Sequence, residues 1–560
     1  MAAGCSAAAR LSRLSSECQM TIIEKSPFIS LSTCGLRLYA GGDVDNIDAL
    51  SKTAYGVQRD KNYFQDVKGV TVVSETEADA IDAASTEVTC RNLRTGEHFS
   101  LHYDALLVAT GAEPLMPDFP FVESPYIYSF YSPSDAIHLR EAAQQGKIGN
   151  AVVIGADLVG CELSEALTVL WGIETILVEK DESILPDVLD PELSLYLQSR
   201  VDPAKVHLML SAPVERIECN ENGSPVVFTR DAKQIKCDVV INCSGLNPNS
   251  ALAQQIGVMV GHHGGILVDE NMKTSVSGVW AAGNCVETRN LVTNNFDFLP
   301  FVSCANRMGR VAANSIMGVD DSFKGTVGTV SLKFFDNIVA ASGLTMRKAK
   351  ELRLDVGSVI GCWSDRPEYN PEGKLIFGKL VYEKGSLRLL GLQLVGEGEV
   401  TRYIDVFSEL LSQGRAINDL LNLEHAFSPD HSSPVSPLNY LGFMAISQEK
   451  DGLRNISPVA ALTFDGTIID VRENSEMGSL PFAGESIHIP LAELRSRRSE
   501  FSGQERLIFA CSKGPRGYEA ARLFHNYGHK NVAYLGGGIA LYNKLVAKAR
   551  RENNKLKVDL

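Results

Sequence analysis

The chain has 560 residues, of which 44% are hydrophobic and 22% are charged, and its formal net charge is −15 at pH 7. These proportions are those of ordinary globular proteins, and at about 150 residues per domain the length corresponds to three or four domains. The negative charge argues against nucleic acid or an anionic membrane as the main partner, and no apolar run approaches the ~20 residues of a membrane-spanning helix.

Twelve cysteines are scattered singly along the chain, without a CxxC pair. This pattern is typical of free thiols in a reducing compartment, not of a disulfide framework or a structural zinc site. We therefore expect a cytoplasmic protein with no metal. The N-terminal segment MAAGCSAAARLSRLSSECQM is rich in serine and arginine and poor in acids, so a mitochondrial transit peptide is the alternative to a first helix of a nucleotide-binding unit.

The first half of the chain alternates short apolar runs with helical patterns. Residues 21–25 and 105–112 read as buried strands, and residues 150–180 read as strand, glycine turn, helix and strand. Residues 237–245 repeat the strand and glycine, and residues 265–286 read as strand, turn and strand. Such a pattern predicts parallel sheets that are covered on both faces.

The second half follows a different pattern. Residues 325–445 predict an antiparallel sheet with helices. The stretch 446–456, ISQEKDGLRNI, is polar and predicts a linker. The last unit, 457–560, contains a strand-like TIIDVRE and predicts a separate domain.

The segment VVIGADLVG has the layout of a dinucleotide-binding turn. Gly155 suits the tight turn, Gly160 suits close packing of helix on strand, and Glu179 suits the adenosine ribose hydroxyls, which favours NADH over NADPH. The middle glycine of the motif is replaced by Asp157, which brings bulk and negative charge close to a diphosphate. The alternative is a strand–helix turn that binds no ligand.

A weak internal repeat indicates a second nucleotide site. Gly4 is followed by a small-residue helix and by Glu24, as Gly160 is followed by a helix and by Glu179. The strand and the first glycine of this unit would precede Met1. We therefore expect an empty sheet position and a phosphate-binding turn that does not close.

Cys34 lies in FISLSTCGLRLY, after the strand at 21–25 and before a glycine near the expected start of a helix. A helix N-terminus lowers the pKa of a thiol and leaves the thiolate accessible. No second cysteine follows four or five residues on, so the motif is not a paired redox dithiol. The alternative is that Cys34 is a small buried hydrophobic residue.

Cys511 begins the segment CSKGPRGYEAARLF, which follows the strand-like RLIFA and opens a helix. The C-x-x-G-x-R spacing predicts a loop whose backbone N–H groups point at the sulfur and stabilise a thiolate or a persulfide. Arg516 adds positive charge. The alternative is a buried structural cysteine.

Together these motifs resemble the flavin-dependent pyridine nucleotide–disulfide oxidoreductases, specifically the CoA-disulfide reductase type with a C-terminal rhodanese domain. The resemblance covers nearly the whole chain. It is carried by AAARLSRL, IIEKSPFISLSTCGL, LLVATGAEP, VVIGADLVGCE, VDENMKTSVSGVWAAGN, CANRMGRVAAN, RYIDVF and the loop around Cys511. It implies an α/β fold with two Rossmann-like FAD- and NAD(P)-binding domains, an α+β dimerisation domain and a rhodanese α/β domain.

The resemblance also implies domain bounds and partners. The FAD-binding domain would comprise 1–120 and 245–320, the NAD(P)-binding domain 121–244, the dimerisation domain 321–446 and the rhodanese domain 457–560. The cofactors would be FAD and either NADH or NADPH. The substrate would be coenzyme A disulfide or persulfide, and the protein would be a homodimer with neither nucleic acid nor membrane as a partner.

In the resembling family, the reduced flavin reduces a mixed disulfide with CoA, which here would form on Cys34, while Cys511 with Arg516 would carry a sulfane sulfur. Tyr369 and His431 match aromatic positions that reach into the partner's active site. The implied cofactor contacts are Gly4, Glu24, Lys25, Thr110, Gly111, Asn284, Gly155, Gly160 and Glu179. The implied CoA contacts are Ser6, Arg10, Arg13, Ser30, Thr33 and Asn306; two arginines on one helix suit the CoA phosphates and weaken the transit-peptide interpretation.

Four positions depart from the family pattern. Thr33 replaces the usual asparagine, His431 a tyrosine, Asn284 the FAD-binding aspartate and Asp157 a glycine. The departures concentrate on the reductase half, and the rhodanese loop is intact. The leading hypothesis is a reductase of CoA disulfide, CoA persulfide or polysulfide coupled to a sulfurtransferase. The alternatives are a redox-inactive flavoprotein scaffold with an active rhodanese domain, and an NADH oxidase.

Overall fold

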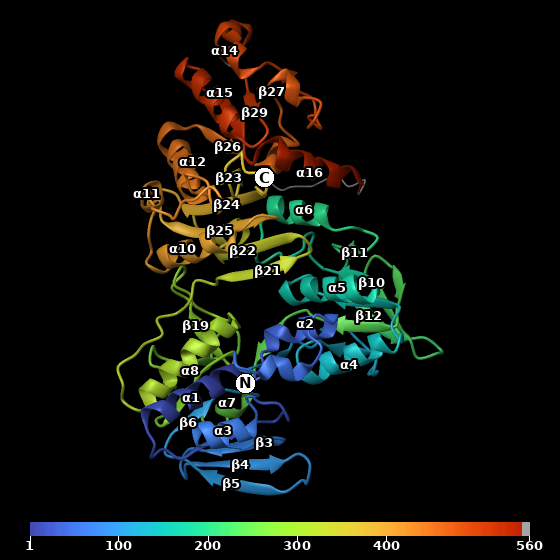
Figure 1. Ribbon diagram of the computed structural model, residues 1–560, viewed down its shortest axis with the longest axis vertical. Coiled ribbons are helices and arrows are strands. Elements are labelled where there is room, and N and C mark those ends of the chain that lie inside the picture. The colour runs from blue at the N-terminus through green and yellow to red at the C-terminus, as the bar shows by residue number, and fades with distance from the viewer. Residues whose placement is uncertain (504, 552–560) are drawn as a thin grey trace. The chain divides into compact units, whose positions relative to one another are not determined.

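The computed structural model describes residues 1–503 and 505–551 and resolves two compact units (Figure 1). The first unit contains Met1–Lys180 and Lys205–Thr326, and the second contains Asp181–Ala204 and the chain from Val327 onward. The last nine positions of the rhodanese domain expected at 457–560 lie outside the described residues.

The first unit holds two separate pairs of parallel strands. β1 (Met20–Ile23) pairs with β2 (Val70–Val73), and β6 (Leu106–Val108) pairs with β18 (Val279–Ala281). Among the described residues these two pairs are separate two-stranded sheets. The printed sequence begins one residue before α1 (Ala2–Leu14).

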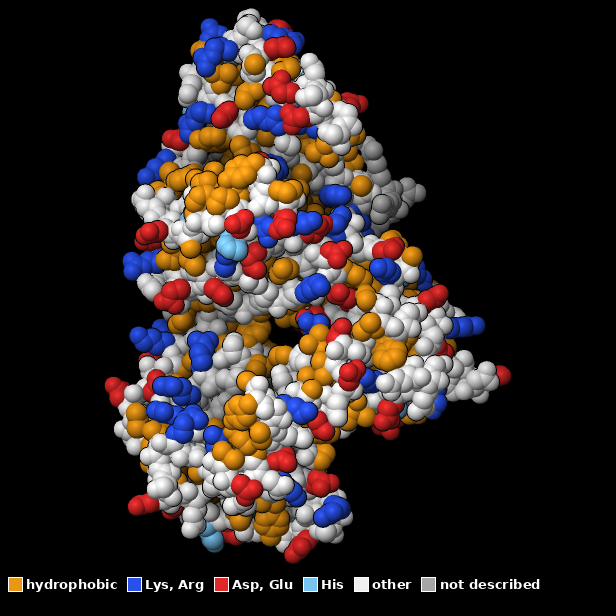
Figure 2. Space-filling view, viewed as in Figure 1, with side chains coloured by type: hydrophobic (Ala, Val, Ile, Leu, Met, Phe, Trp, Pro, Cys, Tyr) orange, Lys and Arg blue, Asp and Glu red, His pale blue; other side chains and the backbone are white. Residues whose placement is uncertain are grey.

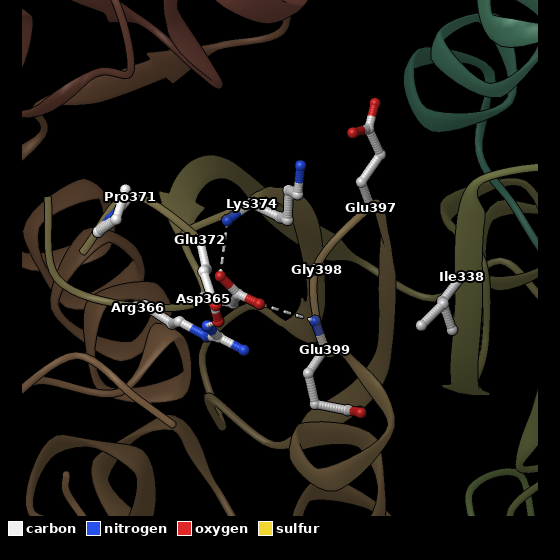
Figure 3. A pocket seen from close by; sticks show the side chains of 9 residues that line it. All are labelled: Ile338, Asp365, Arg366, Pro371, Glu372, Lys374, Glu397, Gly398 and Glu399. Atoms are coloured by element: carbon white, nitrogen blue, oxygen red, sulfur yellow. Dashed lines mark hydrogen bonds and ion pairs between the residues drawn. The ribbon is translucent and has the colours of Figure 1, made fainter. Parts of the chain in front are cut away.

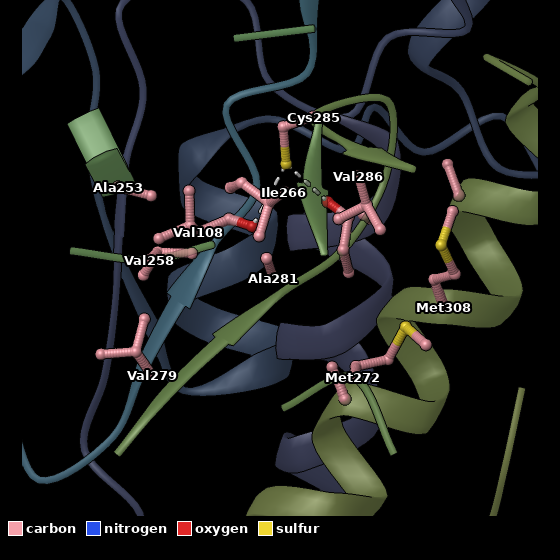
Figure 4. Close-up of a cluster of buried hydrophobic side chains, with 14 of the residues drawn as sticks. Val108, Ala253, Val258, Ile266, Met272, Val279, Ala281, Cys285, Val286 and Met308 are labelled. Atoms are coloured by element: carbon pink, nitrogen blue, oxygen red, sulfur yellow. Dashed lines mark hydrogen bonds between the residues drawn. The ribbon is translucent and has the colours of Figure 1, made fainter. Parts of the chain in front are cut away.

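α1 packs closely against α8 (Val302–Ile316). A Cβ on Gly309 of α8 would lie 2.3 Å from the backbone oxygen of Ala3, so this contact requires a glycine. Figure 4 shows the buried cluster beside it, in which Val108 and Cys285 point toward each other and Met308 enters from α8. This apolar core fixes α1, and with it the predicted CoA-binding side chains, against the rest of the unit.

The dinucleotide-binding half is a five-stranded parallel sheet. Its strands, in spatial order, are β11 (Val206–Met209), β10 (Glu174–Val178), β9 (Asn150–Ile154), β15 (Val239–Asn242) and β8 (Ile127–Ser129). α5 (Leu158–Trp171) connects β9 to β10 and packs on the sheet. The strand, turn, helix and strand predicted over residues 150–180 are thus confirmed.

Smaller elements complete the first unit. Two antiparallel three-stranded sheets are present, β3–β4–β5 and β12–β13–β14. Their bounds are β3 (Thr76–Asp82), β4 (Glu87–Asn92), β5 (His98–His102), β12 (Val214–Cys219), β13 (Pro225–Thr229) and β14 (Gln234–Lys236). The remaining helices are α2 (Leu36–Gly41), α3 (Lys61–Lys68), α4 (Pro133–Gln144) and α7 (Ala251–Gln254), and the short strands are β7 (Ala112–Pro114), β16 (Leu246–Pro248), β17 (Ile266–Leu267), β19 (Val286–Arg289) and β20 (Phe296–Asp297).

The second unit begins with the predicted antiparallel sheet, which is confirmed. Its spatial order is β21 (Val330–Phe334), β22 (Asn337–Gly343), β25 (Leu389–Gly396), β24 (Leu375–Glu383) and β23 (Val356–Ser364). The helices around it are α6 (Pro191–Arg200), α9 (Met346–Glu351), α10 (Thr401–Ser412), α11 (Ile417–Leu421) and α12 (Pro437–Asp451). α6 packs on β24 and β25, although it comes from the middle of the chain.

The linker predicted at 446–456 is wrong. α12 continues to Asp451, where Gly452 adopts the left-handed conformation that ends many helices (φ 69°), and Arg454–Ile456 forms strand β26. The side chain of Gln448 accepts from the backbone N–H of Asn455 at 3.0 Å, which ties the helix to that strand. Ser447 is buried and Gln448 is partly buried, so these polar residues pack within the fold although their composition is typical of a linker.

The C-terminal region is a parallel sheet of five strands. Its spatial order is β26, β30 (Val532–Leu535), β29 (Leu507–Ala510), β27 (Thr467–Asp470) and β28 (Ile487–His488). The helices are α13 (Pro458–Ala461), α14 (Leu491–Arg497), α15 (Pro515–Asn526) and α16 (Gly538–Arg551). Cys511 follows β29 directly and precedes α15, as its motif predicts.

A buried cluster of charges ties the second unit together. Lys379 Nζ lies 2.9 Å from a carboxylate oxygen of Glu192 and 3.2 Å from one of Asp190, and all three side chains are buried. Burial lowers the pKa of Lys379, but the two carboxylates outweigh it and the pKa is raised; the pKa of Asp190 is lowered, because Lys379 and hydrogen bonds outweigh its burial. Ser457 donates to Glu192 at 2.7 Å, so the cluster also holds the start of the C-terminal region.

Within residues 1–503 and 505–551, no helix has the length and apolar character required to cross a bilayer. In the same part of the chain, no group of three or more His, Cys, Asp or Glu side chains is arranged to hold a metal ion.

Candidate active sites around two cysteines

Cys34 lies at the start of a helical segment. A short 3-10 helix, Thr33–Gly35, leads directly into α2, and the thiol is exposed. A Cβ on Gly35 would meet Leu50 Cδ2 at 2.5 Å, so a larger residue here would displace the Leu50 side chain. The predicted position at a helix start is therefore present, and the buried alternative is excluded for Cys34.

The electrostatics of Cys34 differ from the prediction. Partial desolvation of the sulfur raises the pKa of the thiol, the carboxylate of Glu162 raises it further, and Arg37 opposes both. The pKa is thus raised and not lowered as expected for a helix start, because desolvation and the carboxylate together outweigh Arg37. Arg37 Nε lies 3.0 Å from Oε1 of Glu162, and this ion pair partly neutralises the charge of the carboxylate.

Neither Arg37 nor Glu162 is among the predicted site residues. Burial raises the pKa of the Glu162 carboxyl, and Arg37 partly counteracts this. A signal for both exists in the sequence, since Glu162 follows Gly160 of the dinucleotide motif by two positions and Arg37 follows Cys34 by three. These spacings alone do not place the two residues in one site, because Arg37 and Glu162 meet only through the packing of α2 against α5.

The predicted CoA-binding helix α1 makes its polar contacts with α8 and the segment after it. Ser6 Oγ donates to Asn306 Oδ1 at 2.7 Å, so two predicted CoA contacts are brought together. Arg10 Nε donates to Asn314 Oδ1 at 2.7 Å, and Asn314 in turn donates to Asp321 at 2.6 Å. Arg13 is exposed. The helix thus presents one fixed and one exposed guanidinium.

The residues predicted to contact FAD include one polar atom with no partner. Asn284 Oδ1 is buried and accepts no hydrogen bond within the described chain, although Asn284 Nδ2 donates to the backbone oxygen of Pro300. Gly111 has φ +70° with open space where a side chain would start, its nearest neighbour being the Tyr131 hydroxyl at 3.9 Å. An unmet acceptor next to an open glycine turn fits the hydroxyl-rich chain of a flavin dinucleotide.

The other predicted FAD contacts are engaged within the protein. Glu24 accepts from the backbone N–H of Ser26 at 3.0 Å, and its second oxygen lies 4.0 Å from the N-terminal ammonium of Met1. Lys25 pairs with Glu77 at 2.7 Å. Thr110 Oγ1 donates to the backbone oxygen of Asn249 at 2.5 Å. Glu24 therefore keeps a position at the end of β1 that suits a ribose, whereas Lys25 points to a neighbouring carboxylate.

The backbone of the second nucleotide site matches its motif. Gly155 has φ +99°, and a Cβ on Gly160 would lie 1.9 Å from the Gly155 oxygen, so both glycines are required. These features fit a dinucleotide. Two carboxylates, however, already occupy the turn: Glu179 accepts from the N–H of Ala156 at 2.7 Å, and Asp157 accepts from Leu158 at 2.8 Å at the N-terminus of α5.

The predicted partner-reaching residues lie on two loops that touch. Tyr369 lies between β23 and β24 and is 74% exposed, and His431 is exposed on the loop before α12. The Asn370 side chain donates to the backbone oxygen of Pro429 at 2.9 Å, which joins the two loops. The structure therefore places Tyr369 and His431 in one exposed region.

The loop after β29 surrounds the sulfur of Cys511. The backbone N–H of Gly514 donates to Sγ at 3.1 Å, and Gly514 has φ +125°, a conformation that favours glycine. This N–H contact is of the kind that the motif predicts. Cys511 is buried, with 1% of its surface exposed, and it borders a cavity of about 270 Å³. The lining residues are Glu368, Cys511, Ser512, Lys513, Pro515 and Arg516.

Arg516 is held beside the sulfur by neighbours in the same domain. It donates to Glu476 at 2.7 Å and to Ser512 Oγ at 3.0 Å. The hydrogen bond from Arg516 lowers the pKa of Glu476 to about 2, so this carboxylate is ionised at every physiological pH. Glu476 is not among the predicted residues, and its place 40 positions before Arg516 gives no local signal.

These features together define a class of protein: an α/β protein with a turn of the dinucleotide-binding type and an exposed thiol, joined to a domain whose cysteine lies in a loop at the start of a helix. Comparison with known proteins gives the family. Residues 2–300 match the model of the pyridine nucleotide-disulphide oxidoreductases, residues 329–436 match their dimerisation domain, and residues 456–545 match the rhodanese-like domain. The chain therefore belongs to the pyridine nucleotide-disulphide oxidoreductase family, whose members use FAD and NAD(P)H, and it carries a C-terminal rhodanese-like domain.

Individual relatives agree with this assignment. The NAD(P)H coenzyme A polysulfide/persulfide reductase of Pyrococcus horikoshii is 31% identical over 437 residues, which cover 78% of this chain and 95% of the relative. The structure of an NAD-dependent persulfide reductase from A. fulgidus matches with a TM-score of 0.91 and 34% identity, covering 97% of this chain and 98% of that one. Reduced Bacillus anthracis CoADR-RHD matches with a TM-score of 0.89 and 31% identity, covering 98% and 97%. The predicted family and fold class are confirmed.

Proposed function

We propose that this chain is an FAD-dependent NAD(P)H oxidoreductase that reduces CoA disulfide, CoA persulfide or polysulfide through Cys34. The observation that carries the proposal is the single exposed thiol of Cys34 at a helix start, in a chain whose residues 2–300 match a disulphide oxidoreductase. Relatives named for coenzyme A polysulfide, persulfide and disulfide reduction support the substrate class. In the same proposal Cys511 of the rhodanese-like domain carries a sulfane sulfur.

Each half has the groups its chemistry needs. When bound, FAD accepts a hydride from NAD(P)H and passes two electrons to a disulfide. The Cys34 thiolate displaces one thiol of CoA disulfide and forms a mixed disulfide with the other. Arg37 offsets the carboxylate of Glu162 and so assists ionisation of the thiol. In the rhodanese-like domain, the Gly514 N–H and Arg516 stabilise the sulfur anion on Cys511.

The CoA site in this proposal lies along α1 and the segment before α2. Arg10 and Arg13 pair with CoA phosphates, and the Ser6–Asn306 contact fixes two polar groups beside them. The remaining contacts are Ser30 and Thr33, close to the nucleophile in sequence. Ser30 has φ 55°, an uncommon conformation for a residue other than glycine.

The proposed assembly is a homodimer formed through residues 329–436, which match the family's dimerisation domain. Figure 2 shows hydrophobic side chains gathered on the face that carries α12, where Tyr440 and Phe443 are 39% and 47% exposed and Trp363 stacks on Tyr440. An apolar patch of this kind suits burial against a second copy. In the dimer, Tyr369 and His431 reach the reductase site of the partner.

The preferred reductant is NADH, because Glu179 lies at the end of β10, where a carboxylate pairs with ribose hydroxyls and repels a 2′-phosphate. The proposed location is the cytoplasm. It is supported by cysteines that are all unpaired among the described residues.

The test uses purified full-length protein with added FAD. We expect a flavin absorbance spectrum and NADH-dependent reduction of CoA disulfide and CoA persulfide. Cys34→Ser should keep the spectrum and lose the reduction, while the control Cys18→Ser, which removes another partly accessible thiol of the first unit, keeps both. A Cys34→Ser variant that still reduces these substrates would refute the role of Cys34.

An NADH oxidase is the second candidate, because a relative from Enterococcus faecalis with 29% identity over 430 residues is an NADH oxidase. Oxygen consumption with NADH and no thiol acceptor, faster than reduction of CoA disulfide, would favour it. A protein that stays colourless with added FAD would instead favour the scaffold hypothesis, which the Asp157 and Asn284 replacements motivate.

A further inference from the structure

The cavity around Cys511 contains one residue from outside its own domain. Glu368 comes from the hairpin loop between β23 and β24, yet it lines the cavity together with Lys513 and Arg516. Both carboxylate oxygens of Glu368 contact Lys513 Nζ, at 2.6 and 2.7 Å. The rhodanese-like domain and the antiparallel sheet of the second unit thus share one pocket.

The hairpin that carries Glu368 is fixed at its base. Asp365 accepts from the N–H of Lys374 at 2.8 Å and from the N–H of Glu399 at 3.2 Å, as the dashed lines in Figure 3 show. Arg366 pairs with Glu372 across the loop. Arg366 and Glu372 line a second, open cavity of about 590 Å³, whereas the two hydrogen bonds of Asp365 fix the base of the hairpin that carries Glu368.

Each cation that lines the Cys511 cavity therefore has its own carboxylate. Arg516 is paired with Glu476 and Lys513 with Glu368. With Cys511 ionised, the two cations and three anions leave this group with a net negative charge. Such a pocket repels a small dianion, whereas a donor that brings a single charge on an organic body meets less repulsion.

We propose that Glu368 is a specificity-determining residue of the Cys511 pocket, which disfavours inorganic dianions such as thiosulfate as sulfur donors relative to organic persulfides. The proposal rests on the sulfur-carrying role given to Cys511 above. In the transfer, the Cys511 thiolate attacks the outer sulfur of R–S–SH and forms a new S–S bond. The old S–S bond breaks, R–S⁻ leaves with the electron pair, and the proton stays on the transferred sulfur, so no oxidant or reductant is needed.

The experiment compares two donors with the full-length protein, thiosulfate and 2-hydroxyethyl persulfide, with cyanide as acceptor and thiocyanate as the product measured. Glu368→Gln should raise kcat/KM for thiosulfate about tenfold at low ionic strength, because Lys513 becomes uncompensated. The gain should shrink toward unity as salt screens the charge. The value for 2-hydroxyethyl persulfide should stay within about twofold, since that donor carries at most one charge.

Glu372→Gln is the matched control, since it removes the same charge from the same hairpin but lines the other cavity. This variant should leave kcat/KM unchanged for both donors. Lys513→Gln should lower the thiosulfate value, because it leaves Glu368 unopposed. A Glu368→Gln variant with an unchanged ratio of the two donors, or a wild type that prefers thiosulfate, would overturn the role of Glu368 while Cys511 remains the carrier. Thiocyanate formation that survives Cys511→Ser would instead refute the proposed role of Cys511, and the inference with it.

Discussion

Arg37 and Glu162, whose nitrogen and oxygen lie 3.0 Å apart, join the helix that follows Cys34 to the helix that follows the Gly155 turn. The thiol and the dinucleotide-binding turn belong to different parts of the sequence, and this ion pair fixes one against the other. Within the first unit, Trp171 at the far end of α5 also donates to the backbone oxygen of Ala40 in α2 at 2.8 Å. The position of Cys34 therefore depends on the fold of the dinucleotide-binding half.

The first prediction concerns the charge next to Cys34. Glu162→Gln removes a carboxylate that raises the pKa of the thiol and leaves Arg37 free to lower it. The pKa of Cys34 should therefore fall, and alkylation by iodoacetamide at pH 7 should become several-fold faster. The measurement is the alkylation rate of Cys34 against pH, followed by peptide mass spectrometry. Glu174→Gln, an exposed carboxylate on β10, is the control, and equal rate profiles for the two variants would contradict the prediction.

The second prediction concerns Asp157 in the dinucleotide turn. Asp157→Gly removes a carboxylate from the place where a diphosphate approaches the N-terminus of α5, so the affinity for NADH should increase by about three- to tenfold. Equilibrium titration of NADH fluorescence with flavin-free protein measures this affinity, because bound flavin would oxidise the NADH. Asp157→Asn keeps the side-chain cap and removes only the charge, and should show most of the gain. A weaker affinity in both variants would mean that Asp157 assists binding.

The third prediction concerns Arg516 in the Cys511 loop. A lysine cannot contact both oxygens of Glu476 and Ser512 at once, so Arg516→Lys should slow sulfur transfer to cyanide by about ten- to a hundredfold. Because the pKa of Glu476 is about 2, the wild-type rate should show no titration of this carboxylate between pH 4 and pH 8. A rate profile with an inflection that disappears in Glu476→Gln would be inconsistent with that low pKa.

The fourth prediction concerns the buried charges of the second unit. Lys379→Met leaves Asp190 and Glu192 buried without a cation, which should lower the free energy of unfolding by about 3–5 kcal/mol. The measurement is urea unfolding at pH 7, followed by circular dichroism. The variant that also carries Asp190→Asn and Glu192→Gln should recover most of the loss; a single variant as stable as wild type would show that water reaches the cluster.

The pH dependence of the stability that this cluster contributes follows from the shifted pKa values of Lys379 and Asp190. The pKa of Lys379 is raised above 10.5, so its contribution is complete below that value and is lost as the pH rises through the folded-state pKa. The pKa of Asp190 is lowered from 3.8, so its contribution is complete above that value and is lost as the pH falls through the folded-state pKa. The difference in stability between wild type and Lys379→Met should therefore be largest between these limits.

Sequence patterns were sufficient for the parts of the fold that local periodicity determines. The strand, turn and helix around Gly155, the antiparallel sheet and the loop of Cys511 all have short-range signals, and all are present. The polar stretch 446–456 predicts a linker, because the polar end of a helix and a short edge strand have the same composition as a linker. Its distinguishing contact, Gln448 with Asn455, depends on the fold of the chain between them.

The candidate sites divide in the same way. Cys34, Cys511 and Arg516 stand out from their motifs, whereas Glu476 and Glu368 contribute through partners 40 and 145 residues away. No local sequence pattern predicts the pairing of Glu476 with Arg516 or of Glu368 with Lys513. The direction of the pKa shift at Cys34 has no sequence signal either, since it depends on desolvation of the sulfur and on a carboxylate from α5, both of which are set by packing.

The salt-bridged cluster of the second unit can form only after Lys379 has been synthesised. Glu192 and Lys379 are 187 residues apart, and at about 5–20 residues per second the lysine leaves the ribosome roughly 10–40 s after the glutamate. During that time Asp190 and Glu192 lack the cation that pairs with them in the folded protein. A nascent chain that stalls before residue 379 should therefore contain the complete sequence of the nucleotide-binding region, while Asp190 and Glu192 remain without the cation of Lys379.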